Sequence, residues 1–213
     1  DNVAGKTFKG NIKVANTNCS FNESMSSGDY VLLKSTGASS VAEAKSQISN
    51  KGTPDFATVT TALDKGMYKA QDDLGTSYYF RGAVDNNWVK YGKYTKDMYN
   101  CNNGTISATD TGNSCTKIAS SGDDMYWRII RINGDGSIRM IYSGTTAPTE
   151  STKVVMTGTG TQIGTSAFNS MNGKAEYVGY KYTLGEQHGT NTDSTIKTKI
   201  DNWYKTTTLE TDS

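Results

Sequence analysis

Residues 126–142, YWRIIRINGDGSIRMIY, place two apolar runs that carry arginines on either side of an Asn-Gly-Asp-Gly turn. Asn and Gly tolerate the left-handed backbone that tight hairpin turns require, so the stretch predicts two antiparallel strands. Apolar side chains alternate onto both faces of this hairpin. We therefore expect it to lie inside a sheet that is covered on both sides.

The length of the turn decides which side chains face each other across the hairpin. An odd, three-residue loop would set Arg131 directly opposite Arg139, and like charges in that position destabilise the ladder. A loop of two or four residues instead places Arg131 opposite Ile138 and Trp127 opposite Tyr142. We expect this even register.

Guanidinium groups inside a covered sheet need oxygen partners, because an unpaired buried charge is very costly. Carboxylates or carbonyl groups can meet this need, and either Asp72 or Asp73 is a candidate partner for Arg81 or Arg128. The predicted structural ion-pair residues are Arg81, Arg128, Arg131, Arg139, Asp72 and Asp73.

Upstream of this hairpin the chain is aromatic and strand-like. Residues 76–84 and 88–94 flank Asn86-Asn87, which predicts a second hairpin. Residues 76–142 then form an antiparallel meander of four strands, within an α+β fold that has a few packed helices and long polar loops. Its aromatic residues either fill the core or face a ligand, and strand alternation must bury some of the four: Tyr78, Tyr79, Trp88 and Tyr91.

Two segments predict helices, three predict short strands and one predicts irregular structure, and residues 167–182 predict aromatic strand or turn material. Ser40 stands three residues before Glu43, a capping-box spacing, ahead of an apolar stripe that Gly52 ends. Asp193 or Ser194 can cap a C-terminal helix that should lay Trp203 on the sheet, with its apolar stripe at Ile196, Ile200, Trp203 and Tyr204. Strands are expected at 7–16, 30–34 and 153–156, with irregular structure between 53 and 75.

These elements suggest two parts. Residues 1–52 form an N-terminal region of strands and a short helix that packs on the main domain, and residues 53–213 form a β-rich main domain with an insert at 95–124. Cys101 and Cys115 bracket a polar loop within this insert, and closing about 15 residues would remove roughly 3 kcal/mol of chain entropy from the unfolded state. We predict a disulfide, and hence an oxidising compartment. Cys19 is free, pairs between chains, or pairs with a cysteine outside this sequence.

The composition excludes some functions. Charged residues make up 20% of the chain, with 22 Lys and Arg against 21 Asp and Glu, whereas nucleic-acid binding requires a clustered basic surface. No run approaches the roughly 20 apolar residues that span a bilayer. The N-terminus also lacks the pattern of a signal peptide. We therefore expect a mature or excised piece of an exported protein, located at the cell surface or outside the cell.

The sequence offers few groups for catalysis. The single histidine, His188, lies in a polar loop, which is more typical of a solvated side chain than of a catalytic base. No cluster has the spacing of a zinc site. Acidic turns at 72–75 and 133–136 could donate oxygens to calcium, but Asp-Gly and Asn-Gly are ordinary turn residues. We predict no catalytic residue, metal or cofactor, and no enzyme.

Five ordered blocks resemble a family of exported proteins of Firmicutes and related bacteria, many of whose members look like type II secretion pseudopilins or type IV pilin-like proteins. The blocks are DDLGTSYYFRGAVDNNWVKYG, YWRIIRINGDGSIRMIYSGT, IGTSAFNS, YVGYKY and NTDSTIKTKIDNWYK. The resemblance implies a prepilin-type helix ahead of this region, and a cysteine after the Trp203 helix. It implies no activity. Separately, the WRI strand and the Trp-bearing helix resemble C-type-lectin-like modules by fold analogy.

Two functions remain open. The first is a non-enzymatic extracellular protein that assembles with itself as a pilin-like filament or surface-appendage subunit. The second is an adhesin module of lectin-like fold that binds a carbohydrate or a host receptor. Both place the protein outside the cell, and neither involves nucleic acid.

Overall fold

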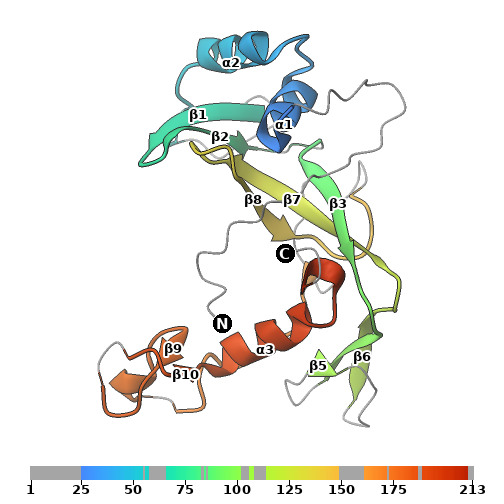
Figure 1. The fold of residues 1–213 in the computed structure, drawn as a ribbon, viewed down its shortest axis with the longest axis vertical. Coiled ribbons are helices and arrows are strands. Elements are labelled where there is room, and N and C mark those ends of the chain that lie inside the picture. The colour runs from blue at the N-terminus through green and yellow to red at the C-terminus, as the bar shows by residue number, and fades with distance from the viewer. Residues whose placement is uncertain are drawn as a thin grey trace. The chain divides into compact units, whose positions relative to one another are not determined.

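Antiparallel sheets and α-helices form most of the described part of the chain in this computed structural model. The residues that the structure describes are 25–54, 56–57, 66–82, 84, 86–101, 106–107, 114–148, 161–171, 173–186 and 189–210. The predicted α+β class with antiparallel sheets is confirmed (Figure 1). The expected strands at 7–16 and 153–156 lie outside the described residues.

The chain divides into two compact units, and the predicted boundary after residue 52 falls inside the first. Unit 1 comprises 1–91 and 126–156, and unit 2 comprises 92–125 and 157–213. The chain passes between the units inside two strands, β3 and β7, whose bounds are Trp88–Lys93 and Asp124–Ile132.

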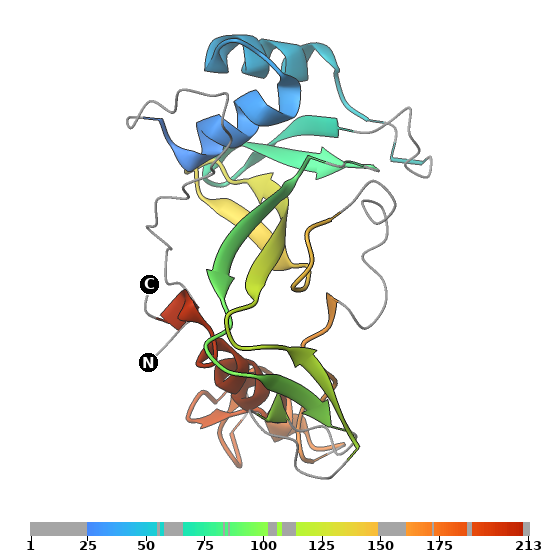
Figure 2. The ribbon, with the colours of Figure 1, turned by 90° about the vertical axis from the view of Figure 1, so that its right-hand side faces the viewer.

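A five-stranded sheet forms the body of unit 1. Its strand order is β1-β2-β7-β3, and β8 also pairs with β7. Figure 2 shows β7 beside its neighbours from a second side. The strands not yet given are β1 (Gly66–Asp72), β2 (Gly75–Arg81) and β8 (Ile138–Tyr142).

Two helices, α1 (Ser27–Thr36) and α2 (Val41–Asn50), pack with this sheet and with each other. Apolar side chains from both helices and from four strands form one buried cluster, and their packing removes apolar surface from water. The buried members of this cluster are Val31, Leu32, Ala44, Ile48, Met67, Tyr78, Val89, Ile129 and Ile132. The hairpin stretch supplies Ile129 and Ile132 to this core. The expectation that both of its faces are covered is wrong, because Ile130 and Ile141 are exposed to 40% and 47%.

Helix α1 shows that the strand predicted at 30–34 was wrong. The hydroxyl of Ser26 accepts a hydrogen bond of 3.1 Å from the backbone N–H of Asp29, which caps the first turn. Gly37 ends the helix in the left-handed conformation, at φ 70°. The residues YVLLK favour a strand locally, but these two caps and the burial of Leu32 favour the helix.

Helix α2 was predicted correctly. Ser40 accepts a hydrogen bond of 3.2 Å from the backbone N–H of Glu43. The carboxylate of Glu43 accepts from the backbone and hydroxyl of Ser39, one residue earlier than a capping box would place this contact. Gly52, two residues past the helix end, has φ 72°.

The region expected to be irregular, 53–75, instead contains β1. It pairs antiparallel with β2 through a two-residue turn at Asp73-Leu74, with Asp72 opposite Gly75. A carboxylate oxygen of Asp72 accepts a hydrogen bond of 2.9 Å from the backbone N–H of Leu74. The acidic cluster thus forms a turn, as ordinary turn chemistry predicts.

The hairpin predicted around Asn86-Asn87 does not form. β2 pairs with β1 and β7, and β3 lies beside β7 rather than beside β2. Asn87 contacts β7 instead: its backbone oxygen accepts from Ile129 N at 2.7 Å and its amide donates to Ile129 O at 3.1 Å. An asparagine that favours a turn locally therefore serves as a long-range link to the central strand.

The register of the central hairpin was predicted correctly in one half and wrongly in the other. Trp127 lies opposite Tyr142, as expected, but Arg131 lies opposite Arg139. The register shifts between Ile129 and Arg131, so β7 contains one extra residue there. This bulge lets both Ile129 and Ile132 reach the core, and burial of these side chains outweighs the repulsion between the arginines.

In unit 2 the predicted polar insert forms a small sheet of its own. The three strands pair in the order β5-β4-β6 and have bounds Ile106–Ser107, Met98–Cys101 and Cys115–Ala119. The predicted disulfide is confirmed, and it joins Cys101 to Cys115, which are opposite partners in the ladder. Met98 and Cys101 are almost fully buried, so the insert has an apolar side.

Helix α3 (Thr195–Tyr204) confirms the C-terminal helix, with Ser194 rather than Asp193 as its cap. Trp203 is buried as expected, but Lys197 and Lys199 are buried as well, while Ile196 and Ile200 are only partly covered. Before the helix, two short strands pair, β9 (Lys181–Tyr182) with β10 (Thr192–Asp193). A short 3-10 helix, η3 (Ala175–Tyr177), precedes β9, and another, η4 (Thr208–Glu210), follows α3.

Candidate functional site: an exposed apolar segment in unit 2

The predicted arginine sites contact several kinds of group. Arg128 is buried, and it donates to the side-chain oxygen of Asn87 at 2.9 Å and to the backbone oxygen of Val84 at 3.4 Å. Arg131 donates to Asn133 at 2.7 Å. These are the oxygen partners that buried guanidinium groups require. The pairing of Asp72 or Asp73 with Arg81 or Arg128 stays a prediction.

The remaining two arginines differ in their surroundings. The guanidinium carbon of Arg81 lies 5.0 Å from the centre of the Phe56 ring, within the range of a cation–π contact. Arg139 is exposed. Asp73 is also exposed, in the turn between β1 and β2.

The four candidate ligand-facing aromatics do not form one platform on the surface. Tyr78 belongs to the core of unit 1, and Tyr79 lies 6.1 Å from the ring of Tyr68. Trp88 is half-buried beside Tyr126, with ring centres 5.6 Å apart. Tyr91 is half-buried, and its backbone oxygen accepts the indole N–H of Trp127. Strand alternation explains this, since neighbouring positions point to opposite faces.

His188 and Cys19 lie outside the described residues. So do Asn18, Asn22 and Asn103, which match the glycosylation pattern, as an Asn- and Thr-rich chain does by chance. The acidic turn at 133–136 closes on itself, with Asp135 accepting hydrogen bonds from the backbone N–H and the hydroxyl of Ser137. The ranges that the structure describes contain no group of three or more His, Cys, Asp or Glu arranged to hold a metal.

The segment 168–184, in unit 2, exposes an unusual amount of apolar surface. Nine large apolar side chains are exposed among the described residues, and five of them fall in these 17 positions: Phe168, Met171, Val178, Tyr180 and Leu184. Val178 and Leu184 are exposed to 71% and 67%. Single exposed apolar residues are ordinary, so five within 17 positions mark this segment as the candidate for an interaction site.

The backbone of this segment is attached to the start of α3. The carbonyl oxygen of Phe168 accepts a hydrogen bond of 3.1 Å from Ile196 N, one of the N–H groups that a helix start leaves unsatisfied. The carbonyl oxygen of Tyr180 accepts from Ser194 N at 3.0 Å. The segment therefore presents its apolar side chains while its main chain is tied to a helix.

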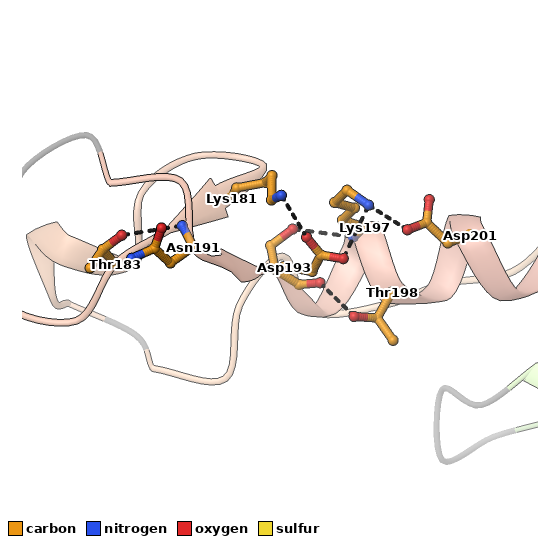
Figure 3. Close-up of polar contacts among 8 residues, drawn as sticks. Lys181, Thr183, Asn191, Asp193, Lys197, Thr198 and Asp201 are labelled. Atoms are coloured by element: carbon orange, nitrogen blue, oxygen red, sulfur yellow. Dashed lines mark hydrogen bonds and ion pairs between the residues drawn. The ribbon is translucent and has the colours of Figure 1, made fainter. Parts of the chain in front are cut away.

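Ionic contacts reinforce this attachment (Figure 3). The ammonium group of Lys197, which is almost fully buried, bonds to carboxylates on both sides: Asp193 at 3.1 Å, and Asp201. Lys181 in β9 lies 3.6 Å from the other oxygen of Asp193. The Lys197 ammonium also lies 5.8 Å from the centre of the Tyr180 ring.

The charges shift one another in the expected directions. The hydrogen bond to Asp201 raises the pKa of Lys197, and the hydrogen bond from Lys197 lowers the pKa of Asp193. Burial raises the pKa of the Tyr180 phenol. The first two shifts favour the charged, paired forms of Lys197 and Asp193, as expected for an ionic network that supports the segment.

A second buried lysine of α3 lies beside an asparagine of β4. A Cβ placed on Gly164 would come within 2.7 Å of the Asn100 side-chain oxygen and 3.2 Å of Cε of Lys199. The Lys199 ammonium donates to the Thr165 carbonyl oxygen, and burial lowers the pKa of Lys199. Only glycine fits at position 164, where φ is 148°.

The sequence indicated only aromatic strand or turn material at 167–182, and did not predict the exposed apolar segment. Two signals were available: the lack of apolar alternation, and glycines at 173, 179 and 185 that interrupt any regular element. Neither signal tells whether other residues cover a side chain, because exposure depends on which part of the chain packs over the segment.

No known family model, curated protein or solved structure matches this chain. The resemblance to pilin-like exported proteins therefore rests on the five sequence blocks alone and stays a prediction, as does the lectin-like analogy. Among the helices that the structure describes, none is both long and apolar enough to cross a membrane.

Proposed function

We propose that the chain is a non-enzymatic, extracellular surface protein that acts as a subunit of a pilin-like filament or surface appendage. The observation that carries this proposal is the segment 168–184, whose main chain is tied to α3 while five of its large apolar side chains are exposed. A surface of this kind suits contact with a macromolecular partner.

The disulfide supports an extracellular location. Structural disulfides persist in oxidising compartments such as the bacterial cell surface, and they are rare in the cytosol. Cys101–Cys115 closes the β4–β6 ladder of unit 2. The five sequence blocks that resemble exported, pilin-like proteins point in the same direction.

Fractionation and imaging of the producing cells test the proposal. An antibody against the protein should label the surface of intact cells, and immunogold electron microscopy should place the label along filaments or appendages. Deletion of the gene should remove those structures. Label found only in the cytosol, or appendages that persist unchanged and unlabelled, would count against the function.

The runner-up is a carbohydrate- or receptor-binding adhesin module of lectin-like fold. The observation that favours it is the pair Tyr177 and Tyr182, whose half-buried rings lie 4.5 Å apart near the exposed Tyr180. Aromatic rings that remain partly accessible offer faces on which a sugar ring can stack. Retention of a defined glycan by the purified protein on an array, lost in Tyr180→Ala and Tyr182→Ala, would favour this function.

A further inference from the structure

We propose that the segment 168–184 is the contact surface between copies of this chain. The inference rests on the proposed function, because an assembly of one subunit needs a surface that binds a second copy. It adds to that function the particular residues that make the contact and the chemistry of the partner.

The first argument is the cost of leaving the segment uncovered. Val178 and Leu184 expose most of their side chains, and Phe168 and Met171 are about half exposed. Covering such apolar side chains releases roughly 25 cal/mol for each Å² removed from water. The five exposed side chains of this segment thus offer a large gain to any partner that matches them.

The second argument is charge, which decides between kinds of partner. The segment carries both signs, with Lys174 and Lys181 against Glu176, and Lys181 is already paired with Asp193. It therefore lacks the basic excess that anionic lipid or a polyanion requires. A second copy brings the same apolar residues with the same mixture of charges, so Lys174 of one copy can meet Glu176 of the other.

The third argument is that the chain as a whole does not repel itself. The 22 basic and 21 acidic residues leave a formal net charge of +1, and near-neutral proteins associate with little electrostatic opposition. The main-chain bonds to Ser194 N and Ile196 N also hold the segment in place before contact. Less ordering entropy is then lost on association.

Sedimentation-velocity centrifugation of the purified oxidised chain, over a range of concentrations, tests the inference. The wild type should show concentration-dependent self-association. The double variant Val178→Asn with Leu184→Asn should raise the dissociation constant at least about tenfold, because each change removes an apolar side chain that the second copy would cover. Leu74→Asn is the matched control, because Leu74 is exposed to 60% in the β1–β2 turn of unit 1.

The control should leave the dissociation constant within about twofold of the wild type, as expected for a surface residue away from the contact. Circular dichroism checks that all three proteins keep the same fold. A wild type that stays monomeric, a double variant that associates as strongly as the wild type, or a control that weakens association equally would each overturn the inference. Surface labelling of cells would still report on the proposed function, so the two can fail separately.

Discussion

The indole N–H of Trp203 donates a hydrogen bond of 2.8 Å to the hydroxyl of Tyr94, a residue 109 positions earlier in the chain. Both side chains are buried. The bond ties the end of α3 to the segment that follows β3, within unit 2. Tyr94 also forms a backbone bridge with Thr207, so the C-terminal residues are attached at two points.

Replacing Tyr94 with Phe should destabilise unit 2 without removing its ring. The change takes the acceptor from the buried indole, and a buried donor without its acceptor costs about 1 to 3 kcal/mol. Urea denaturation should show the loss as a lower midpoint. Tyr180→Phe, at a tyrosine that is exposed to 41%, serves as the control and should change the midpoint little. Equal effects of the two changes would contradict the role of the Trp203 bond.

Breaking the disulfide should lower thermal stability under oxidising conditions. Cys101→Ser and Cys115→Ser each open a loop whose closure contributes roughly 3 kcal/mol. Scanning calorimetry should show a lower Tm for both variants, and reduction of the wild type should bring it down to the same value. Cys19→Ser should leave intact the mass loss of about 2 Da on forming Cys101–Cys115. A Tm unchanged in Cys101→Ser would refute the stabilising role of the bridge.

Adding a methyl group at Gly92 should cost more than adding one at Gly122. Both glycines have left-handed backbone, with φ 80° and 90°, so alanine is strained at each. A Cβ at Gly92 would also lie 2.7 Å from a methyl of the buried Leu209, whereas nothing lies within 4 Å at Gly122. Overpacking should add about 1 to 3 kcal/mol to the cost of Gly92→Ala, measured by denaturant unfolding.

The two buried lysines of α3 should respond to alkali in opposite directions. Burial lowers the pKa of Lys199 in the folded chain below its ordinary value of 10.5. Between these two pKa values the unfolded chain binds more protons than the folded chain, so the free energy of unfolding rises with pH. The pKa of Lys197 is raised by Asp201, so its contribution is complete below 10.5 and is lost as the pH rises through the folded pKa.

Denaturant unfolding from pH 7 to pH 11.5, with Lys197→Met and Lys199→Met beside the wild type, measures both effects. The stability advantage of the wild type over Lys199→Met should grow as the pH approaches 10.5, and its advantage over Lys197→Met should shrink above 10.5. Parallel curves for the two variants would contradict the assignment of opposite shifts.

Removing one charge from the central hairpin should stabilise it at low salt. Arg131 and Arg139 face each other across β7 and β8. Arg139→Thr removes their repulsion and should raise the free energy of unfolding by about 0.2 to 1 kcal/mol. The gain should disappear at high salt, which screens exposed charges. Arg139→Lys keeps the charge and should show no gain, so stabilisation by both changes would point to another cause.

Local chemistry was enough to predict some elements. Ser40 and Ser194 cap helices α2 and α3, since each serine precedes an amphipathic run, and such caps act over only a few residues. The disulfide also followed from the sequence, since two cysteines bracket a polar loop. Hydrogen bonds that close within one turn or one loop can be recognised without knowledge of the rest of the chain.

The errors have two causes. Asn87 suits a turn, but it bonds to Ile129, 42 residues away, and this distant partner could not be identified from sequence spacing. The alternating residues at 30–34 suit a strand, but the local caps at Ser26 and Gly37, together with packing in the core, favour a helix. In that case a local signal was present in the sequence and was overlooked.

Residues close together in the chain, or a strong hydrophobic pattern, were enough to predict the α+β class, helices α2 and α3, the central hairpin and the bridge between Cys101 and Cys115. The tertiary structure decided the strand order, the bulge that opposes Arg131 to Arg139, and the burial of two lysines on α3. It also decided that five large apolar side chains of the segment 168–184 are exposed. Burial is a property of the whole packed chain, because the same residue is covered or exposed according to which distant segment reaches it.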